Sequence, residues 1–281
     1  MDRRTGRQWI LSAGLTLIAG IPTAVAELPT MQERRWLGYY AGFANRNYEF
    51  RMTPQGEAEI KVIGKNDKAI GANHAVSIDF VVEEILPDGR VARKPIIGES
   101  IQSEQPATAK IAGAGIVIRG KVKGDATFEI FLDESRGSLL FGGRLLHSGS
   151  SQNPLRLSIQ AKFNDLLPSK PDLSDRKKAK AFEQKTKGDR LQYVHVDGER
   201  GKLSISDLAD VSALSGPGIK SMELEVSIHQ GKKFEFAASD HSSMMLINKG
   251  AIPLGKGFTV SWAADIAKDP EGKARFSITV R

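Results

Sequence analysis

The amino-acid sequence predicts an all-β fold: two antiparallel β-sandwich or barrel-like domains joined by a basic, partly helical connector. Three observations lead to this prediction: three hairpin turns of the pattern Pro-x-Gly, an alternation of apolar and polar residues in most other segments, and one stretch that interrupts the alternation. Strands at such spacing, with glycine-rich turns between them, are typical of antiparallel sandwiches and barrels.

Each Pro-x-Gly turn sets the register of a hairpin. Proline presets φ at the first turn position, and glycine can take the left-handed conformation that closes the turn. The turns at 54–56 and 87–89 predict the cross-strand pairs Tyr48–Val62, Phe50–Ile60, Met52–Ala58, Glu83–Arg93 and Ile85–Val91. The turn at 270–272 predicts a closing hairpin with the pairs Trp262–Val280, Ala264–Ile278 and Ile266–Phe276.

Alternation predicts further strands at residues 115–122, 126–132, 138–146, 155–163, 191–196, 222–228 and 234–238. A helix is expected after Ser174, because Ser174 is a good N-cap, Gly188 is a good C′ residue, and the interval is rich in Lys, Ala, Glu and Gln. A turn or two of helix is also expected near residues 206–213.

Residues 166–189 interrupt the strand pattern. They include Pro168 and Pro171, and after these prolines the only large apolar residues are Leu173 and Phe182. Such a composition is typical of a segment between domains. The sequence therefore predicts an N-terminal β domain over residues 27–165, a basic connector over 166–189 and a C-terminal β domain over 190–281.

Residues 1–26 have the pattern of a cleavable signal peptide. Three arginines precede an apolar stretch at 9–21, and residues 24–26 read Ala-Val-Ala, a small-x-small cleavage site. The alternative is an uncleaved anchor, but the apolar run is shorter than the roughly 20 residues of a helical bilayer span. The protein is therefore expected to be exported (periplasmic, on the cell surface or secreted), with no transmembrane segment in the mature chain.

Composition and motifs restrict the chemistry. There is no cysteine, which excludes disulfides, a thiolate nucleophile and cysteine-based metal sites. His195 and Asp197 share a strand face, and His229 ends another polar face that Asp240-His241 follows shortly after. No metal-ligand spacing is present among them. These positions fit the solvent-facing side of a half-buried sheet. We therefore predict no metal ion, no cofactor and, since no nucleophile or acid/base motif is found, no catalytic residue.

Two clusters suggest contacts with other molecules. The segment from Lys170 to Arg190 contains eight basic residues and four acidic ones, which suggests either a solvated linker or a weak contact with an anionic polymer. Aromatic residues are not interleaved with these charges, so nucleic-acid binding is not expected. The densest aromatic cluster, which fits a ligand mouth but fits core packing better, is Trp36, Tyr39, Tyr40 and Phe43 with Arg34, Arg35 and Arg46.

These features favour an exported, non-catalytic β protein that binds a partner or ligand in the bacterial envelope or outside the cell. One alternative is a secreted carbohydrate-active hydrolase, which would need two carboxyl groups within about 5 to 10 Å in an aromatic-lined cleft. Another is a structural component of the envelope. The sequence does not define the ligand, because a fold alone does not specify one.

Cleavage after Ala26 would place Glu27 at the start of the mature protein. Mass spectrometry of the exported protein is expected to show the loss of residues 1–26, which lowers the formal net charge from +7 to +5 by removing three arginines and Asp2. An intact N-terminus in the membrane fraction would contradict this prediction.

Overall fold

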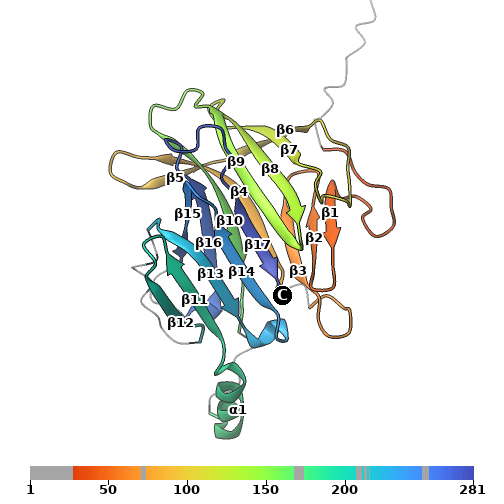
Figure 1. Ribbon diagram of the computed structural model, residues 1–281, viewed down its shortest axis with the longest axis vertical. Coiled ribbons are helices and arrows are strands. Elements are labelled where there is room, and N and C mark those ends of the chain that lie inside the picture. Colours follow the sequence, from red (N-terminus) through yellow and green to blue (C-terminus); the bar gives the residue numbers. More distant parts are fainter. Residues whose placement is uncertain are drawn as a thin grey trace, which may run out of the picture.

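The computed structural model describes residues 28–70, 74–167, 174–206, 211, 214, 216–248 and 253–281. The predicted signal peptide lies outside the described residues, as does most of the short helix expected at 206–213. In the described ranges the chain is nearly all antiparallel β-strand, with a single α-helix (Figure 1).

The strands are β1 Ala41–Ala44, β2 Tyr48–Met52, β3 Ala58–Val62, β4 Val76–Ile85, β5 Val91–Lys94, β6 Ile96–Ser103, β7 Ile116–Val122, β8 Thr127–Ser135, β9 Ser138–His147, β10 Leu155–Phe163, β11 Arg190–His195, β12 Arg200–Ser204, β13 Ile219–Glu225, β14 Lys233–Ala238, β15 Ser242–Ile247, β16 Phe258–Ala264 and β17 Phe276–Val280. The helix α1 is Arg176–Thr186, and short 3-10 helices lie at Ser227–His229 and Leu254–Lys256.

Hydrogen bonds join the strands into one sheet that curls until its two halves face each other (Figure 1). The first layer has the order β1-β2-β3-β4-β10-β16-β15, with β5 also paired to β4. The second layer has the order β12-β11-β13-β14-β17-β9-β8-β7-β6. A bridge between Ile219 of β13 and Met244 of β15 joins the two layers, and a second bridge joins Ala41 of β1 to Thr108, in the segment between β6 and β7.

The core lies between the layers, because the period of two in each strand directs one set of side chains inward. Phe163 of β10 makes edge contacts with Phe234 and Phe236 of β14, at ring-centroid distances of 5.3 and 5.8 Å. Trp262 of β16 stacks on Phe276 of β17 at 6.3 Å. These aromatic contacts tie the inner faces of the two layers together.

Two of the three predicted hairpin registers are confirmed. The β2–β3 hairpin pairs Tyr48 with Val62, Phe50 with Ile60 and Met52 with Ala58, and the β4–β5 hairpin pairs Glu83 with Arg93 and Ile85 with Val91. Gly56 has the positive φ, 83°, that its turn requires. The strand before the second turn is buried on both faces at its centre, where Val81 and Val82 are both buried.

The predicted closing hairpin is wrong, because β16 and β17 lie in different layers. Strand β16 pairs with β10 and β15, whereas β17 pairs with β14 and β9. The Asp269 carboxylate accepts hydrogen bonds from the backbone amides of Lys273 and Ala274, at 2.7 and 2.8 Å. This side chain shapes a loop that crosses between the layers, so Ile266 is exposed instead of opposing Phe276.

The prediction of two domains joined by a basic connector is not confirmed. Strands from the first half pair with strands from the second, β10 with β16 and β9 with β17, and buried residues of both halves form one hydrophobic core. Leu166 and Leu167, assigned to the connector, belong to this core. The predicted helix is present as α1, but its N-cap is Asp175, whose carboxylate accepts from the amides of Lys177 and Lys178.

The shared core can be tested at Phe276, which is fully buried. Replacing Phe276 by Ala is expected to lower the free energy of unfolding of the whole protein by about 3 to 5 kcal/mol through lost burial and a residual cavity. The neighbouring Ser277 is partly exposed, so Ser277→Ala should change it by no more than about 0.5 kcal/mol. Urea unfolding measures both, and equal losses would show that β17 does not pack as described.

Candidate functional site

A cleft opens where strand β4 changes partners. Strand β3 pairs with β4 from Val76 to Ile78, and β5 pairs with it from Val82 to Ile85. Between these two ladders lies a three-residue interval of β4 that neither strand covers. A cavity of about 600 Å³ lies there, between the tip of the β2–β3 hairpin, the middle of β4 and the strand β6.

The floor of the cleft is apolar and comes from both layers. Ile78 and Phe80 of β4 face Ile118, Phe128 and Ile130 of β7 and β8. All five are buried, with exposed fractions of 7% or less. The floor is therefore a part of the inter-layer core that the interval in β4 leaves accessible.

The rim of the cleft is polar. Strand alternation turns the polar neighbours of the floor residues outward, and the rim consists of Tyr39, Arg51, Thr53, Gln55, Glu57, Glu59, Ser77 and Asp79. Of the acidic side chains, Glu59 forms an ion pair with Lys61 at 2.6 Å, and Asp79 forms ion pairs with Lys162 and with Arg93. The cleft thus combines an apolar interior with a polar margin in which Glu59 and Asp79 are ion-paired.

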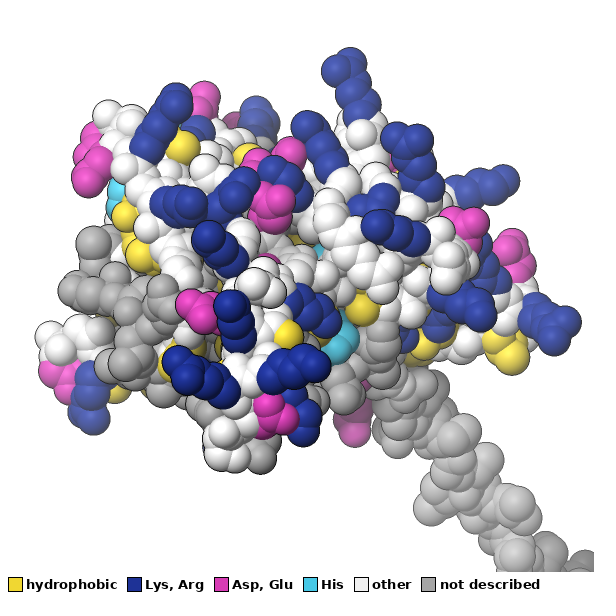
Figure 2. Space-filling view, turned by 90° about the horizontal axis from the view of Figure 1, so that it is seen from below, with side chains coloured by type: hydrophobic (Ala, Val, Ile, Leu, Met, Phe, Trp, Pro, Cys, Tyr) yellow, Lys and Arg dark blue, Asp and Glu magenta, His cyan; other side chains and the backbone are white. Residues whose placement is uncertain are grey.

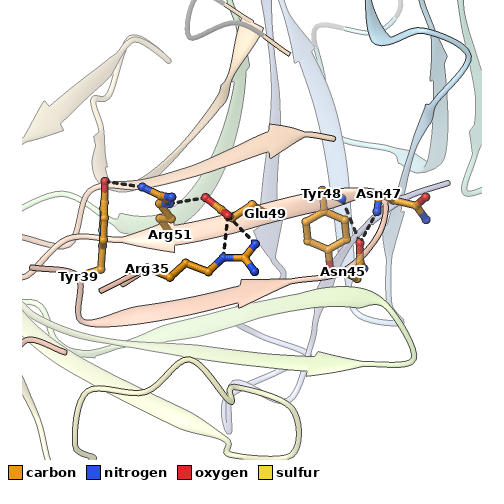
Figure 3. A network of polar contacts seen from close by, with 7 residues as sticks. All are labelled: Arg35, Tyr39, Asn45, Asn47, Tyr48, Glu49 and Arg51. Carbon is orange, nitrogen blue, oxygen red and sulfur yellow. Dashed lines mark hydrogen bonds and ion pairs between the residues drawn. The ribbon is translucent and has the colours of Figure 1, made fainter. Parts of the chain in front are cut away.

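Arg51 is held at the rim by a network of polar contacts (Figure 3). The Glu49 carboxylate accepts hydrogen bonds from the guanidinium of Arg35, at 2.8 Å, and from that of Arg51. Arg51 also donates to the Tyr39 hydroxyl at 3.2 Å and lies over the Tyr39 ring at 4.9 Å from its centroid. Arg51 is therefore oriented from two sides.

The indole of Trp36 packs against the two arginines of this network. Strand β1 places Gly42 opposite Arg51, and a Cβ atom at Gly42 would overlap the Trp36 ring. Glycine is required there because the ring packs directly on the β1 backbone. The guanidinium groups of Arg35 and Arg51 lie 5.1 and 5.8 Å from the Trp36 ring, in cation–π range.

The network keeps Glu49 ionised. Burial opposes the charged form of this carboxylate, but hydrogen bonds and charge from Arg35 and Arg51 outweigh burial and lower the pKa of Glu49 below its ordinary value. At neutral pH Glu49 is thus a fixed negative charge that orients two arginines. It is not suited to donate a proton.

The aromatic cluster singled out in the sequence divides between two roles. Tyr40 is fully buried and Trp36 is 6% exposed, so both belong to the interior. Tyr39 and Arg35 serve the site: Tyr39 forms part of the cleft rim, and Arg35 binds Glu49. Adjacent residues of one short segment are therefore divided between the core and the polar surroundings of the cleft.

The structure does not gather the histidines into a site. His195 Nδ1 lies 3.2 Å from the Gly218 carbonyl, and the carboxylate of Asp197 accepts from the Glu199 amide. His229 was expected to face solvent but is fully buried, because β13 ends before it. Burial, and secondarily the charge of His74, lowers the pKa of His229 to about 4. In the part of the chain that the structure describes, no three metal-ligating side chains converge.

Comparison with known proteins informs the fold alone. No protein family model matches the chain, and no curated protein is significantly similar to it. Among solved structures, the chain resembles part of the α-N-acetylgalactosaminidase NagBb from Bifidobacterium bifidum, determined with Gal-NHAc-DNJ, with a TM-score of 0.52 and 12% identity. The match covers 85% of this chain but 36% of the enzyme chain, so it is a likeness to one portion of a larger protein.

Fold and site together define a curled, two-layer antiparallel β protein with an open cleft beside β4. None of the helices in the described ranges has the length and apolarity that a membrane crossing needs. The cleft was not predicted from the sequence. A signal for it was present in β4, where the inward parity of Ile78, Phe80 and Val82 conflicts with the register set by the turn at 87–89.

The charge network of Glu49 predicts a pH-dependent stability. Glu49→Gln is expected to lower the free energy of unfolding by about 1.5 to 3 kcal/mol at pH 7, since it weakens charged hydrogen bonds to two arginines. Because the folded-state pKa is below the unfolded one, this contribution is complete above the ordinary value of 4.5 and is lost as the pH falls through the folded value.

Urea unfolding at pH 7 and at pH 3 measures the difference between the wild type and this variant. Glu57→Gln is the matched control, since Glu57 lies in the β2–β3 hairpin that also carries Glu49, is exposed, and forms no ion pair with any residue that the structure describes. A gap between Glu49→Gln and the wild type that stays constant with pH would show that the carboxylate is not ion-paired as described.

Proposed function

We propose that this protein is an exported, non-catalytic β protein that binds a ligand in the bacterial envelope or outside the cell, and that the cleft beside β4 is its binding site. One observation carries the proposal: an open cavity of about 600 Å³ with an apolar floor and a polar rim. Ligand sites typically have this size and composition, with a few oriented polar groups that confer specificity. Arg51, fixed by Glu49 and Tyr39, is such a group.

Binding accounts for the rim better than hydrolysis does. A glycosidase needs one carboxyl group that stays protonated near neutral pH, which requires a raised pKa. Of the three rim carboxylates, those of Glu59 and Asp79 are paired with cations and that of Glu57 is exposed rather than buried. Arginines lower the pKa of the adjacent Glu49. The likeness to part of a galactosaminidase supports the sheet architecture and adds no catalytic residue.

The apolar floor narrows the type of ligand. Ile118, Phe128 and Ile130 offer no hydrogen-bonding side chain, so a ligand reaching them must present apolar surface. At the rim, Arg51 uses one nitrogen for Glu49 and another for Tyr39, which leaves N–H groups for a polar or anionic end. We also propose that the basic segment within residues 166–189 makes a weak contact with an anionic polymer, away from the cleft.

The dye 8-anilino-1-naphthalenesulfonate combines an apolar ring system with an anion and is a suitable probe of the cleft. Gly98 lies on the cleft wall with no atom within 4 Å of an added Cβ and no positive φ, so Gly98→Trp should fill the cleft without straining the backbone. The dye is expected to bind the wild type saturably and the Gly98→Trp variant at least about tenfold more weakly, a difference of about 1.4 kcal/mol.

The matched control is Gly216→Trp, because Gly216 has the same open surroundings and lies outside the cleft. Equal dye binding by both variants and the wild type would rule out the cleft as the site. Turnover of a chromogenic N-acetylgalactosaminide by the wild type would favour the hydrolase alternative over a non-catalytic role.

A further inference from the structure

The helix α1 projects from one end of the molecule with little packing to hold it (Figure 1). Within α1 Thr186 is the one buried residue, and Phe182 is partly buried against the core. Isolated helices shorter than about 12 to 15 residues are marginal in water, and this helix has 11 residues. Its sequence RKKAKAFEQKT carries five basic residues and one acidic residue. An element so charged and exposed is typical of an interaction surface.

Hydrogen bonds gather further basic loops at the same end. Asp189, just after α1, accepts from the Ser227 amide at 2.8 Å. The adjacent Gln230 accepts from the Lys65 amide at 3.2 Å, and the Lys233 amide donates to the carbonyl of the last residue, Arg281, at 2.8 Å. Loops that are remote in sequence therefore converge beside the helix.

The 3-10 helix Leu254–Lys256 joins the same group. The Gly255 amide donates to the Ile205 carbonyl at 2.7 Å, and the Ile205 amide donates to Asp189 at 3.2 Å. We define the basic end face as the basic residues of α1 with those of the adjoining loops, namely Arg176, Lys177, Lys178, Lys180, Lys185, Lys187, Lys65, Lys68, Lys232, Lys256 and Arg281. All are exposed except Lys232, which is partly exposed.

Few of these charges are neutralised locally. Within the described residues, the ion pairs of the basic end face are Lys178 with Asp175 and Arg281 with Glu235. Figure 2 views the molecule from this end, and Lys and Arg side chains project over much of the surface, with fewer Asp and Glu among them. The rim of the cleft, by contrast, is largely ion-paired.

We propose that the basic end face docks the protein onto an anionic lipid bilayer. This inference rests on the proposed anionic contact of the basic segment and names a lipid surface as the anionic partner. It does not depend on ligand binding in the cleft. Lysine predominates over arginine, and lysine acts as a hydrated point charge suited to a diffuse anionic surface, whereas arginine recognises single phosphates bidentately.

The distribution of the charges favours a surface over a single strand of polymer. They spread over a protruding helix and several loops, without an aromatic platform on which nucleic-acid bases would stack. No large apolar side chain of α1 is fully exposed, so attachment would be electrostatic, through lysines that lie near the lipid surface. Such attachment weakens steeply with ionic strength.

The test is co-sedimentation with vesicles of phosphatidylcholine alone or with 30% phosphatidylglycerol, a composition in the range of anionic bilayers. The protein is expected to sediment with the anionic vesicles at low salt, to remain in solution with neutral ones, and to be released as salt is raised. Reversing three charges with Lys177→Glu, Lys180→Glu and Lys185→Glu should lower the partition coefficient at least about tenfold. Glu has nearly the helix propensity of Lys, so α1 should persist.

The matched control reverses Lys110, Lys121 and Lys123, which are exposed and form no ion pair with any described residue. Lys121 and Lys123 lie at the end of β7, and Lys110 lies in the segment between β6 and β7. This control variant has the same net charge as the α1 variant and should keep most of the binding to anionic vesicles. Circular dichroism verifies that both variants are folded. An equal loss of vesicle binding in both variants would show that only the net charge matters and would overturn the proposal.

Retention on heparin without vesicle binding would overturn the bilayer proposal while leaving the contact with an anionic polymer standing. Equal binding of the wild-type protein to neutral and anionic vesicles would overturn both electrostatic proposals. Dye binding in the cleft should be unchanged in the α1 variant. The dye assay therefore tests the proposed cleft function independently of the vesicle assay.

Discussion

The structure depends on the packing of the two inner faces of one curled sheet. Each layer has an apolar inner side, and the other layer is the main cover for that side in the part of the chain that the structure describes. Phe163 illustrates the constraint: it lies on β10 in the first layer and fills the space between Phe234 and Phe236 in the second. Because strands from both ends of the chain contribute to both layers, the core cannot be divided at the helix without exposing apolar surface.

The cleft is a consequence of how this sheet is paired. Strand β4 has ten residues, whereas β3 and β5 have five and four, so two short strands share one long edge and leave an interval between them. Behind that interval lies the inter-layer core, which explains the apolar floor. The rim is polar because alternate residues of the same strands point outward, and Arg51 is fixed there by Glu49 and by stacking over Trp36.

Charge is organised differently in two parts of the surface. Around the cleft, carboxylates and cations alternate across neighbouring strands and pair, as with Asp79 of β4 and Lys162 of β10. At the end that carries α1, basic residues outnumber acidic ones and most lack a partner among the described residues. The first arrangement suits recognition of a small ligand with a defined orientation, and the second suits attraction to an extended anionic surface.

The sequence by itself determined the local structure. Turn chemistry and alternation specify most of the strands, the registers at Gly56 and Gly89, and the helix after residue 174, because each depends on neighbouring residues. They did not predict β6, β12 or β15. Only the tertiary structure decided which strands share a layer, and there the closing hairpin failed, since Asp269 directs a crossing loop where a Pro-x-Gly pattern predicts a tight turn. The cleft was likewise beyond the sequence, and so was the joining of the basic segment to the other loops of the basic end face, because both are built from segments remote in the chain that the fold brings together.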